Sequence, residues 1–468
     1  MKNVNYMIIM VLIAVLTGCE KFTDVKPKGK NVLDKVTDLD QLLNYEYAEA
    51  GLDIKDACML VNDMFPSITN IPNLLSNPAI TMKKVLFTWD EETDRAALAT
   101  SDSKYETWYK IIGSVANPVL LMADKASGDT RLAARIKAEA YVLRAYFQYL
   151  AVNFYAKAYD PATAATDPGV PYLRENDLLS VPNKKYTVKE VYDLILKDLT
   201  AAFALNSLPD VPANLMRIGK PFAWAVQAKV LMSMHDFDGA LQAANNCLAL
   251  KNIIDDHRNC IAAGVFSRPE MKSAEDLFYT NASLLVQAFT DDMRSSFESG
   301  SILLNYYKKA NGSNYYGLPV DAWGASDYYS GCGLTTVDMY LIQAECKIRS
   351  GRMDDLHEAV NILNKIREYR IIPEQYTPLE ASSKAAAFNI LKNISRTENF
   401  YTCKNYINLK RWNTDDEYKT TLQKTITYTL KGKTESFSYS LQPDSPLWIF
   451  PFPQNATTFN PNLTQNYK

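Results

Sequence analysis

The sequence has few of the residues that build metal sites and covalent catalytic sites. Only three of its 468 residues are histidines, His235, His257 and His357, and they lie far apart. The seven cysteines include no Cys-x-x-Cys spacing and have no adjacent histidine pair, so a zinc site is not indicated. No nucleophile elbow or phosphate-binding loop is present. We therefore expect no metal, no cofactor and no catalytic residues, and interpret the histidines as surface residues.

A block of positive charge and a membrane-spanning segment are also missing. The formal net charge is −3, and without a basic patch the chain lacks the electrostatic footprint of a nucleic-acid-binding protein. The N-terminal apolar run, residues 7–16, has about half the length that a helix needs to cross a bilayer. We exclude nucleic acid as a partner and interpret the run as part of a signal peptide.

The apolar run ends in Leu16-Thr17-Gly18-Cys19, which is the residue order of a bacterial lipobox. A cysteine at a new N-terminus can carry a diacylglycerol, and acyl chains anchor a protein to a membrane. The sequence therefore predicts a lipoprotein signal peptide over residues 1–18, which is removed, and lipidation of Cys19. Residues 19–38 are polar and predict a flexible tether, followed by one domain over residues 39–468.

Six further cysteines leave the question of disulfides open. In an exported chain they can pair, and Cys247 with Cys260 is the most plausible pair. Cys346 and Cys403 are interpreted as small buried residues, and no bridge is predicted. The six are Cys58, Cys247, Cys260, Cys332, Cys346 and Cys403.

Apolar spacing predicts a mainly α-helical chain. A first helix is expected over residues 40–50, another over 105–121, and the longest over 131–155. Thr187 and Glu190 form a capping-box pattern at the start of a further helix. The segment after residue 160 is rich in proline and ends the long helix.

Two stretches repeat the same helix-turn-helix pattern. They lie near residues 222–250 and 337–369, and a third pair is expected near 131–205. Small residues at matching positions would let the paired helices approach closely, as in tetratricopeptide repeats. These residues are Ala228, Ala240, Ala344 and Ala359. That these are unrelated helical hairpins stays an alternative.

Two segments do not follow a helical pattern. Residues 291–332 hold many aromatic residues among glycines and asparagines, which predicts a loop-rich surface. Tyrosine, present 29 times against 18 phenylalanines, combines a flat apolar ring with a hydroxyl group and suits such surfaces. Residues 446–454 contain three prolines, which exclude an α-helix and predict an extended segment lying across the helices.

Several of these segments, taken in order, resemble the SusD/RagB family of surface lipoproteins. The similarity runs over nearly the whole length, and the order of the motifs carries it. The matching motifs are Arg144-Ala145-Tyr146-Phe147 with Tyr155, Pro168-Gly169-Val170-Pro171, Val188–Tyr192 with Asp198-Leu199, Met339–Glu345, Phe450–Pro453 and Asn460–Asn466. The chain departs from the family pattern near Glu398 and Asn408–Trp412, where two charged residues are missing, and this predicts an effect on a structural salt bridge.

The resemblance implies a SusD-like all-helical fold with tetratricopeptide-like helix pairs and an irregular ligand-binding region. It implies a non-catalytic protein at the outer surface of the outer membrane, which binds a glycan and delivers it to a SusC-like TonB-dependent transporter. A peptide-binding, RagB-like uptake lipoprotein is an alternative, and a glycoside hydrolase is a further one. Aromatic residues in expected loops are the candidate glycan contacts, with packing in the core as the alternative for each, namely Trp89, Tyr315, Tyr316, Trp323 and Tyr328. The Asp292-Met293-Arg294 turn is interpreted as structural.

Overall fold

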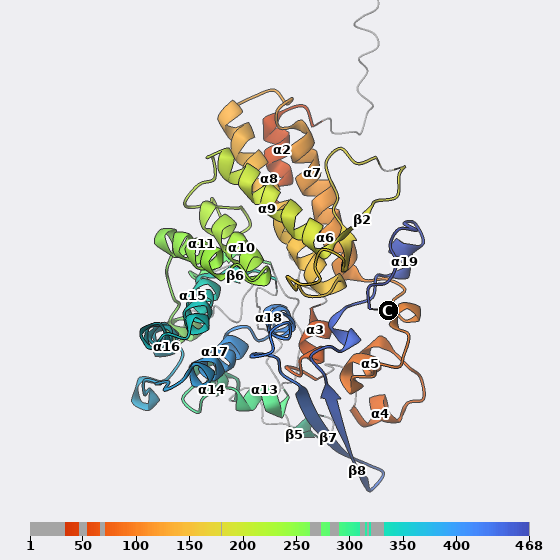
Figure 1. The fold of residues 1–468 in the computed structure, drawn as a ribbon, viewed down its shortest axis with the longest axis vertical. Helices are drawn as coiled ribbons and strands as arrows, with labels where there is room; N and C mark the ends of the chain where they lie inside the picture. Colours follow the sequence, from red (N-terminus) through yellow and green to blue (C-terminus); the bar gives the residue numbers. More distant parts are fainter. Residues whose placement is uncertain are drawn as a thin grey trace, which may run out of the picture.

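Helices form most of the structure, and the strands are few. The computed structural model describes residues 33–45, 54–65, 71–178, 180–262, 273–280, 290–308, 314–315, 318–319 and 332–467. Within these ranges every sheet has two strands, so the predicted mainly α-helical class is confirmed (Figure 1). None of the helices in these ranges has the length and apolar composition that crossing a membrane requires.

The long helix α8 (Thr130–Tyr155) is the centre of the first half of the molecule. Its second half is almost entirely buried, and α9 (Val188–Ala204) packs along it. The Arg144 guanidinium joins the two helices by donating to both carboxylate oxygens of Asp198, at 2.6 and 2.7 Å. The capping box of α9 is confirmed, because Thr187 Oγ1 accepts from the Glu190 N–H at 3.2 Å and Glu190 accepts from the Thr187 N–H at 2.8 Å.

The helix expected over residues 105–121 is interrupted. It consists of α6 (Ser103–Ile111), a π-helical turn (Ile112–Ala116) and α7 (Asn117–Met122). Pro118 explains the interruption, since its ring has no N–H to donate and clashes with the carbonyl four residues earlier. Two short strands, β1 (Pro168–Pro171) and β2 (Lys185–Thr187), pair beside α9.

The two predicted helix repeats are present. They consist of α10 (Lys220–Ser233) with α11 (Phe237–Leu250), and of α15 (Thr336–Ser350) with α16 (Met353–Glu368). The helices of each pair pack together, and α11 packs on α15. The four predicted small interface residues, Ala228, Ala240, Ala344 and Ala359, are each 0% exposed. The alanines therefore allow the close approach that the sequence predicted.

The C-terminal segment runs across the helices as a strap, which we define as residues 446–453. Its only helical turn is a 3-10 turn at Pro446–Trp448. Arg95 fixes it by donating to the carbonyl oxygens of Pro446 and Ile449, both at 2.7 Å. Phe450 of the strap stacks on Phe154, and Phe452 stacks on Tyr155. The expected extended segment is confirmed apart from the 3-10 turn.

The structure differs from the expected local structure in two places. The first described helix is α2 (Val36–Leu42), which begins inside the expected tether because Val36 and Leu39 are buried and pack α2 against α8. It overlaps the start of the helix expected over residues 40–50, of which 46–50 lie outside the described residues. A long hairpin, β7 (Leu422–Leu430) with β8 (Lys433–Leu441), has no counterpart in the sequence analysis. Its turn uses Lys431 and Gly432, both with positive φ, at 52° and 77°.

The remaining elements are short helices and strands. Two of them, α13 and α14, lie in the region that was expected to be loop-rich, so this part is more helical than predicted. They are α3 (Lys55–Leu60), α4 (Ile71–Ser76), α5 (Met82–Thr88), α12 (His257–Ala262), α13 (Asp291–Ser295), α14 (Ile302–Lys308), α17 (Lys384–Glu398), α18 (Lys404–Trp412), α19 (Gln454–Thr457), β3 (Asp276–Phe278), β4 (Asn314–Tyr315), β5 (Leu318–Pro319) and β6 (Leu334–Thr335).

A buried ion pair joins the second helix repeat to α18. The carboxylate of Glu345 accepts from both Nη atoms of Arg411, at 2.7 and 2.6 Å, from Arg349 at 2.9 Å and from the Trp412 indole N–H at 3.1 Å. The arginines outweigh the burial of Glu345 and lower its pKa to about 2. Despite the missing family residues, this region therefore contains a complete buried salt bridge.

We expect Glu345→Gln to lower the free energy of unfolding by about 3–5 kcal/mol, because it leaves buried arginines without their carboxylate. The lowered pKa means that the folded protein binds fewer protons than the unfolded chain between about pH 5 and pH 2, so stability from Glu345 is lost as the pH falls through this window. Denaturant unfolding at pH 7 and pH 3 measures both effects. Glu358→Gln, at an exposed position of α16, is the control, and an equal loss in both variants would contradict the prediction.

Candidate functional site

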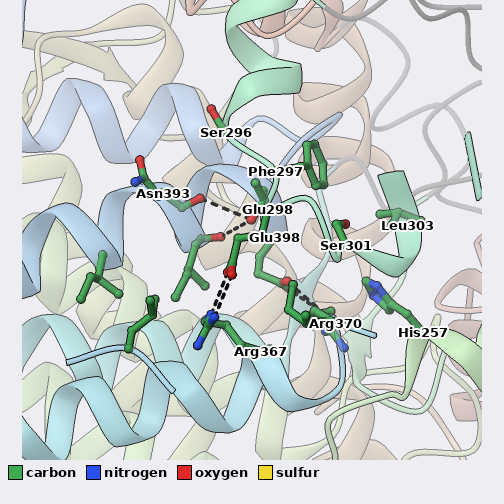
Figure 2. A pocket seen from close by; sticks show the side chains of 15 residues that line it. His257, Ser296, Phe297, Glu298, Ser301, Leu303, Arg367, Arg370, Asn393 and Glu398 are labelled. Atoms are coloured by element: carbon green, nitrogen blue, oxygen red, sulfur yellow. Dashed lines mark hydrogen bonds and ion pairs between the residues drawn. The ribbon is translucent and has the colours of Figure 1, made fainter. Parts of the chain in front are cut away.

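A pocket lies at the end of the molecule opposite the first described helix. We call it the α16–α17 pocket; its volume is about 300 Å³. In Figure 1, α2 lies at one end of the long axis, whereas α13 and the β7–β8 hairpin lie at the other. The pocket is lined by the linker from α13 into α14, by the end of α16 and by α17 (Figure 2). The lining residues are His257, Ser296, Phe297, Glu298, Ser301, Leu303, Arg367, Arg370, Ile371, Leu379, Ile390, Asn393, Ile394, Thr397 and Glu398.

Backbone pairing holds the linker against the end of α16. The Ile302 N–H donates to the Arg370 carbonyl oxygen at 2.9 Å, and the Ile372 N–H donates to the Gly300 carbonyl oxygen at 2.8 Å. Gly300 permits this approach, since a Cβ atom there would lie 2.9 Å from Ile371 Cγ2. The wall of the pocket is therefore set by main-chain bonds and not by side chains alone.

Two arginine–glutamate pairs line the pocket. Arg367 Nε and Nη2 donate to the two carboxylate oxygens of Glu298, each at 2.7 Å. Arg370 Nε lies 3.0 Å from both oxygens of Glu398, and Arg370 Nη2 donates to Glu275 at 3.0 Å. The Arg367–Glu298 pair is bidentate, which fixes the orientation of both partners. The two positive charges of Arg367 and Arg370 are matched by the two negative charges of Glu298 and Glu398. The net charge of the lining residues is therefore zero.

The pKa shifts support a neutral lining. Burial, reinforced by the nearby Arg370 guanidinium, lowers the pKa of His257 well below its usual value, so its imidazole is uncharged at neutral pH. Burial also lowers the pKa of Arg370, but Glu398 and Glu275 outweigh it and raise the pKa above the usual value. Burial raises the pKa of Glu275, and Arg370 opposes this shift. His257 is thus a buried residue, and the expectation that it lies on the surface is wrong.

Hydrogen-bonding and apolar groups alternate around the pocket. Figure 2 shows Ser296 and Asn393 toward one side and His257 with Leu303 toward the other. Phe297 supplies an aromatic ring, which packs edge-on against Phe400 at 5.7 Å. Aliphatic side chains of α17 complete the lining. A pocket with a few polar groups set among apolar walls is the usual form of a small-molecule site.

Trp89, the first predicted glycan contact, is buried and does not line this pocket. It follows α5 in a turn, as expected, but its side chain is only 5% exposed. Its indole N–H donates to the Leu60 carbonyl oxygen at 2.8 Å, and Lys424 Nζ lies 3.9 Å from the ring centroid. Lys424 comes from β7, so the hairpin that the sequence did not predict covers this ring. Trp89 therefore packs in the core, and its expected exposed placement is wrong.

The other predicted contact residues fall where the structure describes little or nothing. Tyr315 belongs to the short strand β4, which pairs with β5. Tyr316, Trp323 and Tyr328 lie outside the described residues, as does Cys19, the predicted lipidation site. Their roles stay predictions. The Asp292 turn is built into the fold, since Asp292 accepts from Arg396 at 2.8 Å and from Asn62 at 3.1 Å.

Metal binding has no support in the described parts of the chain. There, no group of three or more histidine, cysteine, aspartate or glutamate side chains is arranged to hold an ion. All six described cysteines are buried thiols in this structure, and Cys247 and Cys260 are not bridged in it. The sequence analysis predicted none of the residues that line the α16–α17 pocket as site residues; it interpreted His257 as a surface residue and named Glu398 only for the family pattern. Phe297 lies within the expected aromatic region, residues 291–332, and is the one aromatic lining residue that the composition of this region could have suggested.

A second pocket has a different character. It lies between residues 210–222 and the end of α11, has a volume of about 390 Å³, and is mostly apolar. Val211 and Ile253 at this pocket are 83% and 48% exposed. It has no paired charges among its lining residues, and we therefore regard the α16–α17 pocket as the better candidate for a polar ligand.

Two family models match the chain over separate ranges. One, described as starch-binding and associating with the outer membrane, matches residues 21–232, and the SusD family model matches residues 303–468. Together they span more than three quarters of the sequence. The chain belongs to the SusD family. The resemblance predicted from the ordered motifs is confirmed, and the family is one of carbohydrate-binding proteins associated with the outer membrane.

Solved structures share the SusD fold with this chain. A SusD superfamily protein from Bacteroides thetaiotaomicron is 14% identical, with a TM-score of 0.71, covering 92% of this chain and 99% of its own. A putative sugar binding protein from Bacteroides vulgatus is 16% identical, with a TM-score of 0.69 and coverages of 93% and 99%. A SusD-like carbohydrate binding protein from the same species is 15% identical, with a TM-score of 0.65 and coverages of 92% and 98%. No curated protein matches the sequence significantly.

The buried Lys424 of strand β7 makes the stability of the protein depend on pH. Burial lowers its pKa from 10.5 to about 7, and among the described residues its ammonium has no hydrogen-bond partner. The unfolded chain binds more protons than the folded protein between about pH 7 and pH 10, so the free energy of unfolding rises with pH in this window.

We therefore expect Lys424→Met to be more stable than the wild type below pH 7, by an amount on the order of a few kcal/mol, with the difference shrinking toward pH 10. Chemical denaturation at pH 6, 8 and 10 measures it. Lys433→Met, at an exposed position on the same hairpin, is the control. A Lys424→Met variant that is less stable than wild type at pH 6 would show that the charged lysine is favourably bound.

Proposed function

We propose that this SusD-family chain is a lipid-anchored protein of the outer cell surface, which binds a neutral glycan in the α16–α17 pocket. The observation that carries this proposal is the lining of the pocket. Two arginines and two glutamates neutralise one another there, while hydroxyl, amide and aromatic groups face the same space. A neutral sugar matches such a lining, because its hydroxyl groups hydrogen-bond to polar groups and its ring packs on apolar ones.

The position of the pocket supports a capture role. The pocket lies far from α2, and the predicted lipid anchor at Cys19 precedes α2 in the sequence. A ligand arriving from outside the cell would then meet the protein at the end that points away from the membrane. We propose further that the chain delivers the glycan to a SusC-like TonB-dependent transporter, as the family resemblance implies. Tyr315, Tyr316, Trp323 and Tyr328 stay candidate contacts for the parts of a longer glycan outside the pocket.

Binding without catalysis is the favoured form of the function. A glycoside hydrolase needs one carboxylic acid that is protonated and one carboxylate that is free to act. In the pocket, the carboxylates of Glu298 and Glu398 each already accept hydrogen bonds from an arginine, so neither is free for such a role. This pairing suits hydrogen-bond acceptance from a sugar hydroxyl better than proton donation.

An array of neutral glycans, acidic glycans and peptides, probed with residues 21–468, which lack the predicted lipidation site, tests the ligand class. We expect binding to neutral oligosaccharides, weaker binding to uronic-acid-containing ones, and none to peptides. Binding restricted to peptides would contradict the glycan proposal and favour the RagB-like alternative. Steady release of reducing ends from a bound polysaccharide would contradict the non-catalytic role.

We expect Phe297→Ala to weaken binding of the glycan identified on the array by ~1 to 3 kcal/mol, because an aromatic contact at the centre of a site contributes about this much. Isothermal titration calorimetry gives the dissociation constants. Phe437→Ala removes an aromatic ring that is 40% exposed on the β7–β8 hairpin and serves as the matched control. Unchanged affinity in Phe297→Ala, with weakened affinity in Phe437→Ala, would move the site to the hairpin.

A further inference from the structure

Two cysteine side chains from distant parts of the sequence meet in the core. Cys332 precedes β6 and α15, and Cys403 is the N-cap residue of α18. Their Sγ atoms lie 3.8 Å apart, across a sequence separation of 71 residues. The two side chains are 0% and 1% exposed. The fold therefore brings two buried thiols into contact.

The backbone on both sides of this contact is fixed. The Cys332 N–H donates to Thr280 Oγ1 at 2.9 Å, and the Tyr146 hydroxyl donates to the Cys332 carbonyl oxygen. The Cys403 carbonyl oxygen accepts from the Ile407 N–H at 3.1 Å, in the first turn of α18. These hydrogen bonds hold the backbone of both cysteines in place, so the two sulfur atoms stay near each other in the folded protein.

We propose that Cys332 and Cys403 form a disulfide bond in the exported protein. A disulfide needs an S–S distance of about 2.05 Å, so the two sulfur atoms must approach by roughly 1.8 Å in total, a movement that side-chain rotation can share between them. The inference rests on the proposed location outside the cytoplasm, because disulfides persist in oxidising compartments. The bond would link the end of the aromatic-rich segment, residues 291–332, to the start of α18.

The oxidant is an external disulfide, either of a protein oxidase or of glutathione. One cysteine thiolate attacks it and forms a mixed disulfide, releasing one external thiol; the second cysteine thiolate then displaces the other external thiol. The two cysteines lose two electrons and two protons, and the external disulfide becomes two thiols. Since the hydrogen bond from Cys403 and burial raise the pKa of Cys332, thiolate is scarce once the core has closed. The bond therefore forms during folding.

The thiol of Cys58 lies nearby, and a bond between Cys58 and Cys403 is the alternative pairing. Cys58 of α3 donates to the Thr402 carbonyl oxygen at 3.5 Å, next to Cys403 in the chain. Burial is the main cause that raises the pKa of Cys58, which makes it a poor nucleophile. Its thiol hydrogen is already directed to a carbonyl group, whereas the Cys403 thiol is directed to Cys332. The geometry favours the Cys332 pair over a bond to Cys58.

Thiol alkylation of the denatured full chain tests the proposal. Protein isolated from the cell envelope without reductant, and protein refolded with oxidised glutathione, are both alkylated and their peptides identified by mass spectrometry. We expect a linked Cys332–Cys403 peptide in both, with Cys58, Cys247, Cys260 and Cys346 alkylated. Alkylated Cys332 and Cys403 in both samples, or a bond from Cys403 to Cys58, would overturn the pairing. A bond in the refolded sample alone supports the pairing and counts against the proposed location.

Two cysteine variants distinguish the loss of the disulfide bond from a general loss of stability. We expect the linked peptide to persist in Cys58→Ala and to disappear in Cys403→Ala. Reductant should lower the thermal midpoint of the wild type and of Cys58→Ala by about 5 °C, and should leave that of Cys403→Ala unchanged. An equal response of all three proteins to reductant would overturn the proposal.

Discussion

The buried ion pair between Glu345 and Arg411 is the interaction on which the packing of the two halves of this protein depends. The Glu345 carboxylate receives hydrogen bonds from Arg411 and Trp412 of α18 and from Arg349 of its own helix. The same helix α18 reaches the end of α8, since Lys410 Nζ donates to the Asn153 carbonyl oxygen at 2.6 Å. One short helix thus connects the repeats to the long N-terminal helix. Because a lone buried charge costs several kcal/mol, these partners constrain each other's positions.

Paired charge is also the organising feature of the candidate site. Arg367 lies in the last turn of α16 and Arg370 two residues beyond its end. Glu298 comes from the α13–α14 linker and Glu398 from the end of α17. The pairs therefore hold three separate segments around one space before any ligand arrives. A site arranged in advance binds with a smaller loss of conformational freedom. Its cancelled charge leaves shape and hydrogen bonding as the basis of ligand selection.

The sequence predicted the features that depend on local chemistry. The capping box at Thr187, the long apolar helix α8 and the alanine-lined repeats follow from spacing alone, and the order of motifs was enough to predict the SusD family. The burial of Trp89 was not predictable, because the residue that covers it, Lys424, lies on a hairpin far along the chain. Threonines alternate with apolar residues over 425–430, and serines do so over 436–441. This alternation is a strand signal that the sequence analysis overlooked.

The candidate pocket could not be derived from the sequence for a related reason. Arg367 and Glu298 are 69 residues apart, and nothing in either local pattern shows that they meet. Charged residues at helix ends are common on protein surfaces, so their pairing becomes visible only in the folded structure.

The most direct test of the central claim is a crystal structure of the mature chain with a bound neutral oligosaccharide. Our account predicts a sugar ring between the α13–α14 linker and α17, with a hydroxyl group within hydrogen-bond distance of Asn393 or of the Glu298 carboxylate. A sugar bound only elsewhere, with the α16–α17 pocket empty, would contradict the account.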